Sequence, residues 1–264
     1  MARASRGPIS FRVRSGFSST PPMNPPRSDY RESHLCKGED YDDELSANAW
    51  EAYTAAIELT IIDEVIIDRF SEGPRRCMDF ACGTGRLTCF LQERVPYCLG
   101  VDISSSMLAV AKVKCDKSYF LQCDLTRHRV SIGLFDLITA FRFFGNAQDA
   151  LRVEVLSVLN NYLMPDGILV LNNHRNPHAV RNLIHRCTGG RTDMDLTLSK
   201  LQQHTRACKF RVVEIYGVGA WSVRHRWTSW VTRPSKTLRT VERMTRSRVF
   251  ARFAPDMVVV LRKS

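Results

Sequence analysis

Residues 76–102, RCMDFACGTGRLTCFLQERVPYCLGVD, carry the pattern that decides the fold. A short apolar run leads into the turn Gly83-Thr84-Gly85, helical periodicity follows over 86–95, and 97–101 is again short and apolar. Short apolar runs bounded by turn residues are typical of buried strands. The stretch therefore predicts a strand, a glycine turn, a helix and a second strand that ends at Asp102.

Strand-like and helix-like runs continue to alternate after this stretch. We expect helices over 105–114 and 147–163, and strands over 119–123, 135–141 and 168–172. Such alternation is typical of a parallel sheet with helices on both of its faces. The sequence therefore predicts a doubly wound α/β fold.

The flanking segments suggest one domain over 29–264. Apolar residues at three-to-four spacing predict lead-in helices over 42–70. The core is expected over 76–218, with a basic aromatic insert over 221–253 before a closing strand at 257–261.

The first 28 residues contain five arginines and no acidic residue. This composition predicts a disordered basic leader. It also resembles an organellar transit peptide, and Met23 is an alternative start. The expected location is cytoplasmic, or organellar if the leader is a transit peptide.

Composition bounds the class of protein. The chain of 264 residues is 44% hydrophobic, enough for a full core, and carries a formal net charge of +11. No run reaches the roughly 18 apolar residues of a membrane-spanning helix. The nine cysteines form no Cys-x-x-Cys pair, so we interpret them as reduced thiols of a cytosolic-type compartment.

The glycine turn and two acidic residues indicate a binding site. In a parallel sheet, ligands collect at the carboxyl ends of strands, where Asp79, Gly83, Gly85 and Asp102 are placed. Asp102, at the end of the second strand, is suited to accept bonds from both hydroxyls of a ribose. A dinucleotide site needs a third glycine, and that position is Thr88.

The sequence resembles the class I S-adenosylmethionine-dependent methyltransferase family. The resemblance rests on Asp-x-x-x-Gly-x-Gly from Asp79, on 101–104 followed by Met107-Leu108, and on 123–125, and it covers about 76–216. It implies a mostly parallel sheet of seven strands and S-adenosylmethionine as the cofactor.

The same resemblance implies which residues hold the cofactor. The loop at 79–86 would hold the methionine part, Asp102 the ribose, Ile103 and Met107 the adenine faces, and Asp124 with Leu125 the adenine edge. The full expected set is Asp79, Phe80, Ala81, Cys82, Gly83, Gly85, Arg86, Asp102, Ile103, Met107, Asp124, Leu125 and Phe141.

Candidate catalytic and substrate residues lie outside the glycine turn. Methyl transfer is an in-line displacement that needs alignment and, for a hydroxyl acceptor, a base. His174, at the end of the fifth strand, is the first candidate base, and Arg142 is expected near the acceptor. Tyr41 and Trp221 are expected to cover the substrate. His174 and His178 lack a third ligand, so no metal is expected.

Three functions fit these features. The first is methyl transfer to oxygen or nitrogen of a small-molecule or glycan-like acceptor, anionic groups included. Residues 140–146 lack the Asn/Asp-Pro-Pro-Tyr signature that is typical of amino methylation of adenine or glutamine. RNA methylation is an alternative that the basic ends favour, and it predicts strong salt dependence. A non-catalytic scaffold that binds the cofactor is the third.

Overall fold

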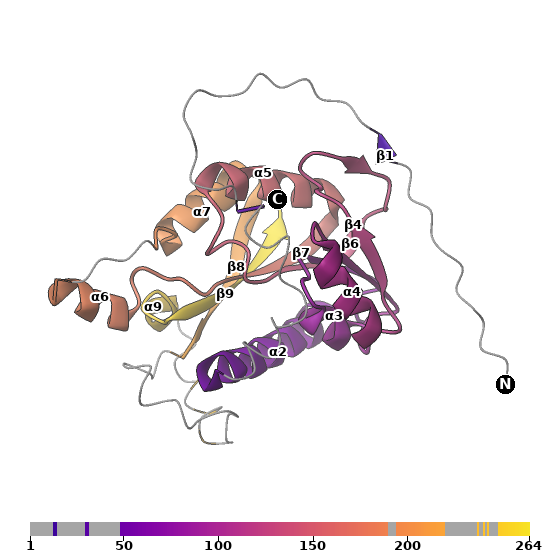
Figure 1. Cartoon of the computed structure of the whole chain (residues 1–264). Coiled ribbons are helices and arrows are strands. Elements are labelled where there is room, and N and C mark those ends of the chain that lie inside the picture. Colours follow the sequence, from indigo (N-terminus) through magenta and orange to yellow (C-terminus); the bar gives the residue numbers. More distant parts are fainter. Residues whose placement is uncertain are drawn as a thin grey trace.

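A computed structural model describes residues 13–14, 30–31, 48–189, 194–219, 237, 240, 242 and 248–264. Its main feature is a central sheet (Figure 1), and its seven strands are in the order β4-β3-β2-β6-β7-β9-β8. The strands are β2 (Arg76–Phe80), β3 (Tyr97–Asp102), β4 (Tyr119–Gln122), β6 (Phe135–Ala140), β7 (Leu163–Asn173), β8 (Phe210–Val218) and β9 (Asp256–Lys263).

The sheet is mostly parallel, as the sequence predicted. The strands β4, β3, β2, β6 and β7 pair in parallel, whereas β9 is antiparallel to both β7 and β8. The chain proceeds outward from β2 through β3 to β4, and then returns to β6 on the other side of β2. The carboxyl ends of β2 and β6 therefore form the switch point at which a ligand is expected.

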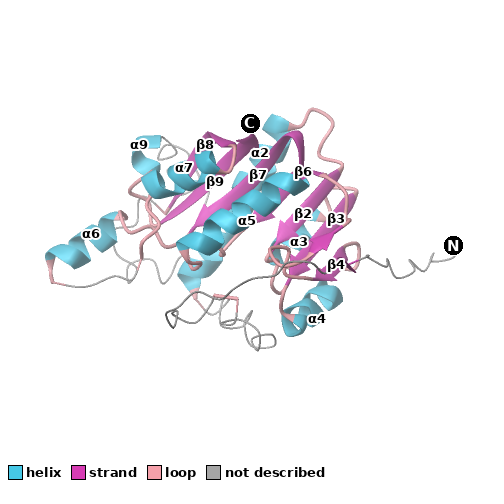
Figure 2. Cartoon of the chain, turned by 90° about the horizontal axis from the view of Figure 1, so that it is seen from above, coloured by secondary structure: helices cyan, strands magenta, loops and turns pink. Residues whose placement is uncertain are grey.

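Helices cover both faces of the sheet (Figure 2). Side chains of α2 and α3 belong to one buried apolar cluster, and side chains of α5 and α7 belong to the other. The helices are α2 (Ala49–Arg69), α3 (Arg86–Leu91), α4 (Ser105–Lys114), α5 (Asp149–Tyr162), α6 (Val180–Cys187), α7 (Leu198–Ala207) and α9 (Arg248–Ala251).

Helix α2 is the described part of the lead-in region, and it is one helix. The side chain of Asn48 accepts a hydrogen bond from the Trp50 amide and so caps the first turn. Tyr53, Ile57 and Ile61 recur at helical spacing and are buried against the sheet. The polar start of α2 is thereby brought to the carboxyl edge of the sheet.

Some boundaries differ from those expected. Strand β7 begins at Leu163, five residues before the predicted start, with Asp166 at φ 63° in the segment that precedes its buried part. Helix α3 ends at Leu91 instead of residue 95. Within the leader, β1 (Val13–Arg14) pairs antiparallel with β5 (Arg129–Val130), and the rest of 1–28 lies outside the described residues.

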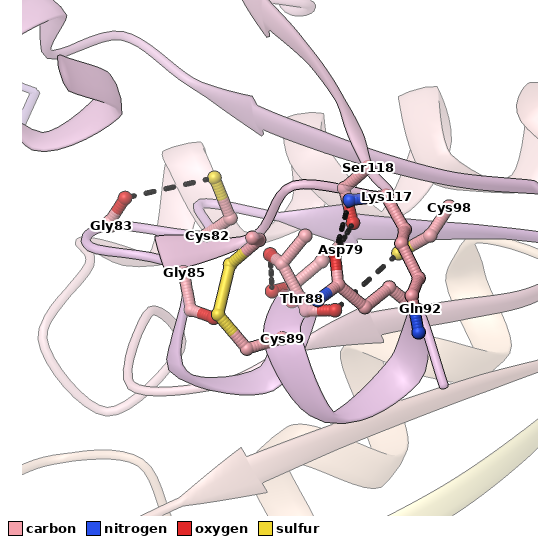
Figure 3. The surroundings of a disulfide bond; sticks show 11 residues. Asp79, Cys82, Gly83, Gly85, Thr88, Cys89, Gln92, Cys98, Lys117 and Ser118 are labelled. Carbon is pink, nitrogen blue, oxygen red and sulfur yellow. Dashed lines mark hydrogen bonds between the residues drawn. A yellow bond between two sulfur atoms is a disulfide. The ribbon is translucent and has the colours of Figure 1, made fainter. Parts of the chain in front are cut away.

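The interpretation of all nine cysteines as thiols was wrong for one pair. Cys89 of α3 and Cys115 at the end of α4 form a disulfide, with their Cα atoms 4.9 Å apart (Figure 3). They are 26 residues apart in sequence, and only the packing of α3 beside α4 brings them together. The other described cysteines are free, and Cys36 lies outside the described residues.

Among the described residues, no helix combines the length and apolar character needed to cross a bilayer.

Candidate cofactor and acceptor site

A cleft opens at the carboxyl ends of β2, β3 and β6. It encloses about 810 Å³ of space, including the part that is open to solvent. Nine of the residues expected to hold the cofactor line this cleft: Phe80, Ala81, Gly83, Asp102, Ile103, Met107, Asp124, Leu125 and Phe141.

Asp102 is held at the cleft by two backbone amides. Its Oδ2 accepts a hydrogen bond from the Gly83 amide at 2.8 Å, and its Oδ1 accepts one from the Ser104 amide at 2.9 Å. Ser104 in turn caps α4 by accepting a hydrogen bond from the Met107 amide at 3.3 Å. The carboxylate is thus fixed between the glycine turn and the start of α4, beside the two residues expected to pack against adenine.

Gly83 leaves room at the cleft. Its φ is +54°, and a Cβ built on it would meet no atom within 4 Å. Gly85 has φ +85° and does not line the cleft. The space beside it is filled by α4 and its end, because a Cβ built on Gly85 would lie 2.8 Å from Cys115 Sγ. The first glycine therefore opens the cleft, while the second permits close packing of the turn on α4 (Figure 3).

Asp79 lies beneath the cleft and does not line it. Its side chain is buried and accepts hydrogen bonds from Thr88 Oγ1 at 2.7 Å and Thr139 Oγ1 at 2.8 Å. Burial raises the pKa of Asp79 to about 6, although both hydroxyl donors oppose the rise. Thr88, which stands where a dinucleotide fold has its third glycine, thus ties α3 to the buried acid of β2.

Two further residues of the expected cofactor set do not line the cleft. Cys82 is buried, and burial raises the pKa of its thiol well above the ordinary value. Arg86 extends toward α2, where its Nη2 pairs with Glu58 Oε2 at 2.7 Å. These side chains contact protein groups, so we expect any contact of this part of the loop with a ligand to come from its backbone.

Two residues that sequence reasoning missed close the other end of the cleft. Tyr30 donates a hydrogen bond from its hydroxyl to the Arg142 carbonyl at 3.1 Å and packs edge-on against Phe143. Arg31 Nε pairs with Asp124 Oδ2 at 3.0 Å. Both line the cleft. Their sequence neighbourhood carries no motif, so only the fold places them here.

Arg142 forms part of the cleft wall. Its φ of 59° is left-handed, and its amide donates to Asn172 Oδ1 at 2.6 Å. Its Nη1 pairs with Glu51 of α2. Burial alone would lower the pKa of Arg142, but Glu58 and Glu51 raise it overall, so the guanidinium is firmly charged.

A buried carboxylate joins α2 to the end of β7. Glu58 is 0% exposed and accepts hydrogen bonds from Arg86 Nη2 and Asn172 Nδ2, both at 2.7 Å. Burial would raise its pKa, but Arg86 and Arg142 lower it overall, so Glu58 stays ionised. Sequence reasoning missed Glu58, although an acid on the apolar stripe of α2 is an available signal.

His174 follows β7 and lines a second pocket, not the cleft. Its Nδ1 is buried and has no hydrogen-bond partner among the described residues. Burial lowers its pKa to about 3, with Arg142 adding to the effect, so the imidazole is neutral near pH 7. Tyr41 and Trp221 lie outside the described residues.

No group of three metal-ligating side chains occurs in the described part of the chain. The sheet order and the acid and glycine cleft at its carboxyl edge are those of a class I methyltransferase. Residues 77–167 match the family model described as a methyltransferase domain. The sheet thus has the class I methyltransferase fold, and residues 77–167 are similar to a methyltransferase domain.

Comparisons with known proteins agree with this assignment. A demethylmenaquinone methyltransferase of Thermus thermophilus is 34% identical over 106 residues, which are 38% of this chain and 47% of that protein. A putative methyltransferase of Bacillus subtilis, YqeM, is 27% identical over 141 residues, covering 51% of this chain and 52% of that protein. This chain spans about half the length of these curated relatives.

Solved structures share the fold at low identity. A SAM-bound amino pentose methyltransferase from Micromonospora echinaspora superposes with a TM-score of 0.57 and 13% identity. The match covers 86% of this chain and 98% of that one.

Proposed function

We propose that the chain is an S-adenosylmethionine-dependent methyltransferase that acts on oxygen or nitrogen of a small-molecule or glycan-like acceptor. The observation that carries the proposal is Asp102, fixed by the amides of Gly83 and Ser104 in the wall of the cleft. Ile103 and Met107 flank it, so a ribose and an adenine have their partners side by side.

The residues present fit this cofactor. The open space over Gly83 admits a ligand against the backbone. Asp102 would accept bonds from the ribose hydroxyls, and the Leu125 backbone would meet the adenine edge. Asp124 would share its carboxylate between that edge and Arg31. When bound, the cofactor supplies a methyl group on a positively charged sulfur, which is activated for in-line displacement.

The chain's own residues would then align the acceptor. Arg142 is held by Asn172 and Glu51, so its position at the cleft is rigid. His174 is neutral, and its low pKa suits it to orient the hydrogen of an acceptor hydroxyl or amine more than to retain a proton. Alignment is thus proposed as the larger contribution of this site.

The acceptor is proposed from the pockets and not from the relatives. One similar protein is named for a demethylmenaquinone and another for an amino pentose, which are chemically unrelated molecules. Similarity to these proteins therefore does not identify the acceptor. The polar pocket beside Arg142 is suited to a small polar molecule. RNA methylation would instead show binding that weakens steeply with salt, which a titration in rising salt would reveal.

Calorimetric titration with S-adenosylmethionine and S-adenosylhomocysteine tests the proposal. Asp102→Ala removes the proposed ribose bonds, and hydrogen bonds to a charged group contribute about 1.5–3 kcal/mol each. The loss of two such bonds lowers affinity by roughly 100-fold or more.

Asp136→Ala is the matched control. Asp136 also accepts two backbone amides, from Arg75 at 2.9 Å and Arg76 at 2.8 Å, but at the opposite edge of the sheet. This variant should bind both ligands like the wild type. If neither ligand binds the wild type, or if both variants weaken binding equally, the proposal fails.

A further inference from the structure

A second pocket lies beside the cofactor cleft, and we call it the β9 pocket. It encloses about 380 Å³, including space open to solvent, between the start of α2, the end of β7, α6 and the start of β9. Its polar lining includes Glu51, His174, Arg181 and Asp256. The ion pair between Arg142 and Glu51 links the two cavities, since Arg142 lines the cleft and Glu51 lines the β9 pocket.

Asp256 is a buried polar group of the β9 pocket. Its side chain is 3% exposed, and its Oδ1 has no hydrogen-bond partner among the described residues. Burial raises the pKa of Asp256 well above the ordinary value, and the neighbouring charge of Glu58 adds to the rise. The rise favours the protonated carboxyl group, which can donate as well as accept a hydrogen bond.

The charges around the β9 pocket do not balance within the pocket. On α2, Glu51 pairs with Arg142 and Glu58 pairs with Arg86. On β7, His174 has a pKa of about 3 and is neutral near pH 7, and on β9 burial favours the protonated form of Asp256. Arg181 of α6 contributes a positive charge, and it has no ion pair among the described residues.

Arg181 is half-buried at the β9 pocket, and its guanidinium lies 6.0 Å from the ring centroid of Trp50 but forms no ion pair with a described residue. Burial lowers the pKa of Arg181, the charges of Asp256 and Glu51 oppose this, and the guanidinium remains protonated at physiological pH. Its forked donors match a carboxylate or a phosphate, which accept two parallel hydrogen bonds. An ammonium group would be repelled by Arg181, and Glu51 and Glu58 are already paired with other arginines.

We propose that the β9 pocket binds an anionic group of the methyl acceptor, a carboxylate or a phosphate, with Arg181 as its counterion and Asp256 as a hydrogen-bond partner. The identity of the bound molecule as an acceptor rests on the proposed methyltransferase function. The presence of an anion site does not, so the two can fail separately. Nearness to Arg142 would place such an acceptor beside the cofactor cleft.

Direct binding of small anions tests the proposal. Acetate and inorganic phosphate are titrated against the full chain in saturating S-adenosylhomocysteine, with saturation-transfer proton NMR for acetate and phosphorus line broadening for phosphate. At least one anion should bind, and the arm that responds identifies the anion class. Acetamide, which is neutral and of similar shape, should bind at least tenfold more weakly.

Variants locate the site. Arg181→Gln should weaken anion binding at least tenfold, whereas Arg186→Gln, on the same helix, should leave it unchanged. Asp256→Asn keeps a neutral hydrogen-bonding group and should retain binding, whereas Asp256→Ala should lower it. Affinity for S-adenosylhomocysteine, measured on each variant, shows that the fold and the cleft are intact.

Three results would overturn the anion site: neither anion binds the wild type, Arg181→Gln binds as the wild type does, or S-adenosylhomocysteine displaces the anion. The last would assign the anion to the cofactor cleft. If S-adenosylhomocysteine itself fails to bind the wild type, the proposed function fails, and anion binding measured without it still decides the β9 pocket.

Discussion

Asp79 should make the stability of this protein depend on pH in a defined direction. The carboxyl is buried beneath the glycine turn, and its pKa is about 6 instead of the ordinary 3.8. The folded state therefore binds the proton more tightly than the unfolded state does. Stability from this group is fully present below the unfolded pKa and is lost as pH rises through the folded pKa.

The magnitude follows from the size of the shift. Two pKa values of 3.8 and about 6 differ by about 2.2 units, which corresponds to ~3 kcal/mol at neutral pH. About 2 kcal/mol of this loss should fall between pH ~4.5 and ~7.5. Asp79→Asn has no titrating group here, so it should lack this part of the pH dependence.

Urea denaturation of both proteins across that range measures the effect. The free energy of unfolding of the wild type, minus that of Asp79→Asn, should fall by about 2 kcal/mol from the acidic to the neutral end. Taking this difference removes the constant effect of the substitution on hydrogen bonding. A difference that stays flat, or one that rises with pH, would refute the reasoning.

A companion variant checks the physical cause. Thr139→Val keeps the side-chain shape but removes one hydroxyl that donates to Asp79. Because that bond favours the ionised carboxylate, its loss should move the pH dependence to higher pH.

The remaining predictions concern the turn and the disulfide beside it. Gly85→Ala places a Cβ 2.8 Å from Cys115 Sγ, whereas Gly83→Ala meets nothing within 4 Å. In urea unfolding, Gly85→Ala should lower the free energy of unfolding by about 1–3 kcal/mol more than Gly83→Ala does. Gly83→Ala should mainly weaken S-adenosylmethionine binding. Equal losses of stability in the two variants would contradict this. Cys89→Ser opens a loop of 26 residues and should lower the free energy of unfolding by roughly 3.5 kcal/mol. Mass spectrometry after alkylation without reductant should find both cysteines blocked, and two free thiols would refute the pairing.

Much of the fold was predictable because its signals are local. The alternation of short apolar runs with helical periodicity identified β2, α3, β3 and α4 within a few residues. Asp102 and Gly83 were identified because each lies at or just after the carboxyl end of a strand, and the end of a strand can be read from the sequence. The start of β7 was missed, because 163–167 contains a proline and a glycine, which usually mark a turn.

Side-chain direction was much less predictable. Asp79 and Asp102 both lie at the carboxyl edge of the sheet, yet only Asp102 reaches the cleft. His174 was expected to face the cofactor site, but it lines the β9 pocket. Sequence spacing places a residue on an element, whereas its neighbours on other elements decide where the side chain points.

The sequence by itself determined the class of fold, the glycine turn and the acid proposed to hold the ribose, because each depends on contacts between residues close together in the chain. Only the tertiary structure decided which groups meet across long separations. It joined Cys89 to Cys115, brought Tyr30 to Arg142, and placed Glu58 of α2 beside the start of β9. Such contacts depend on helix packing and sheet order, and burial between those elements then sets the pKa values and the charge of the β9 pocket.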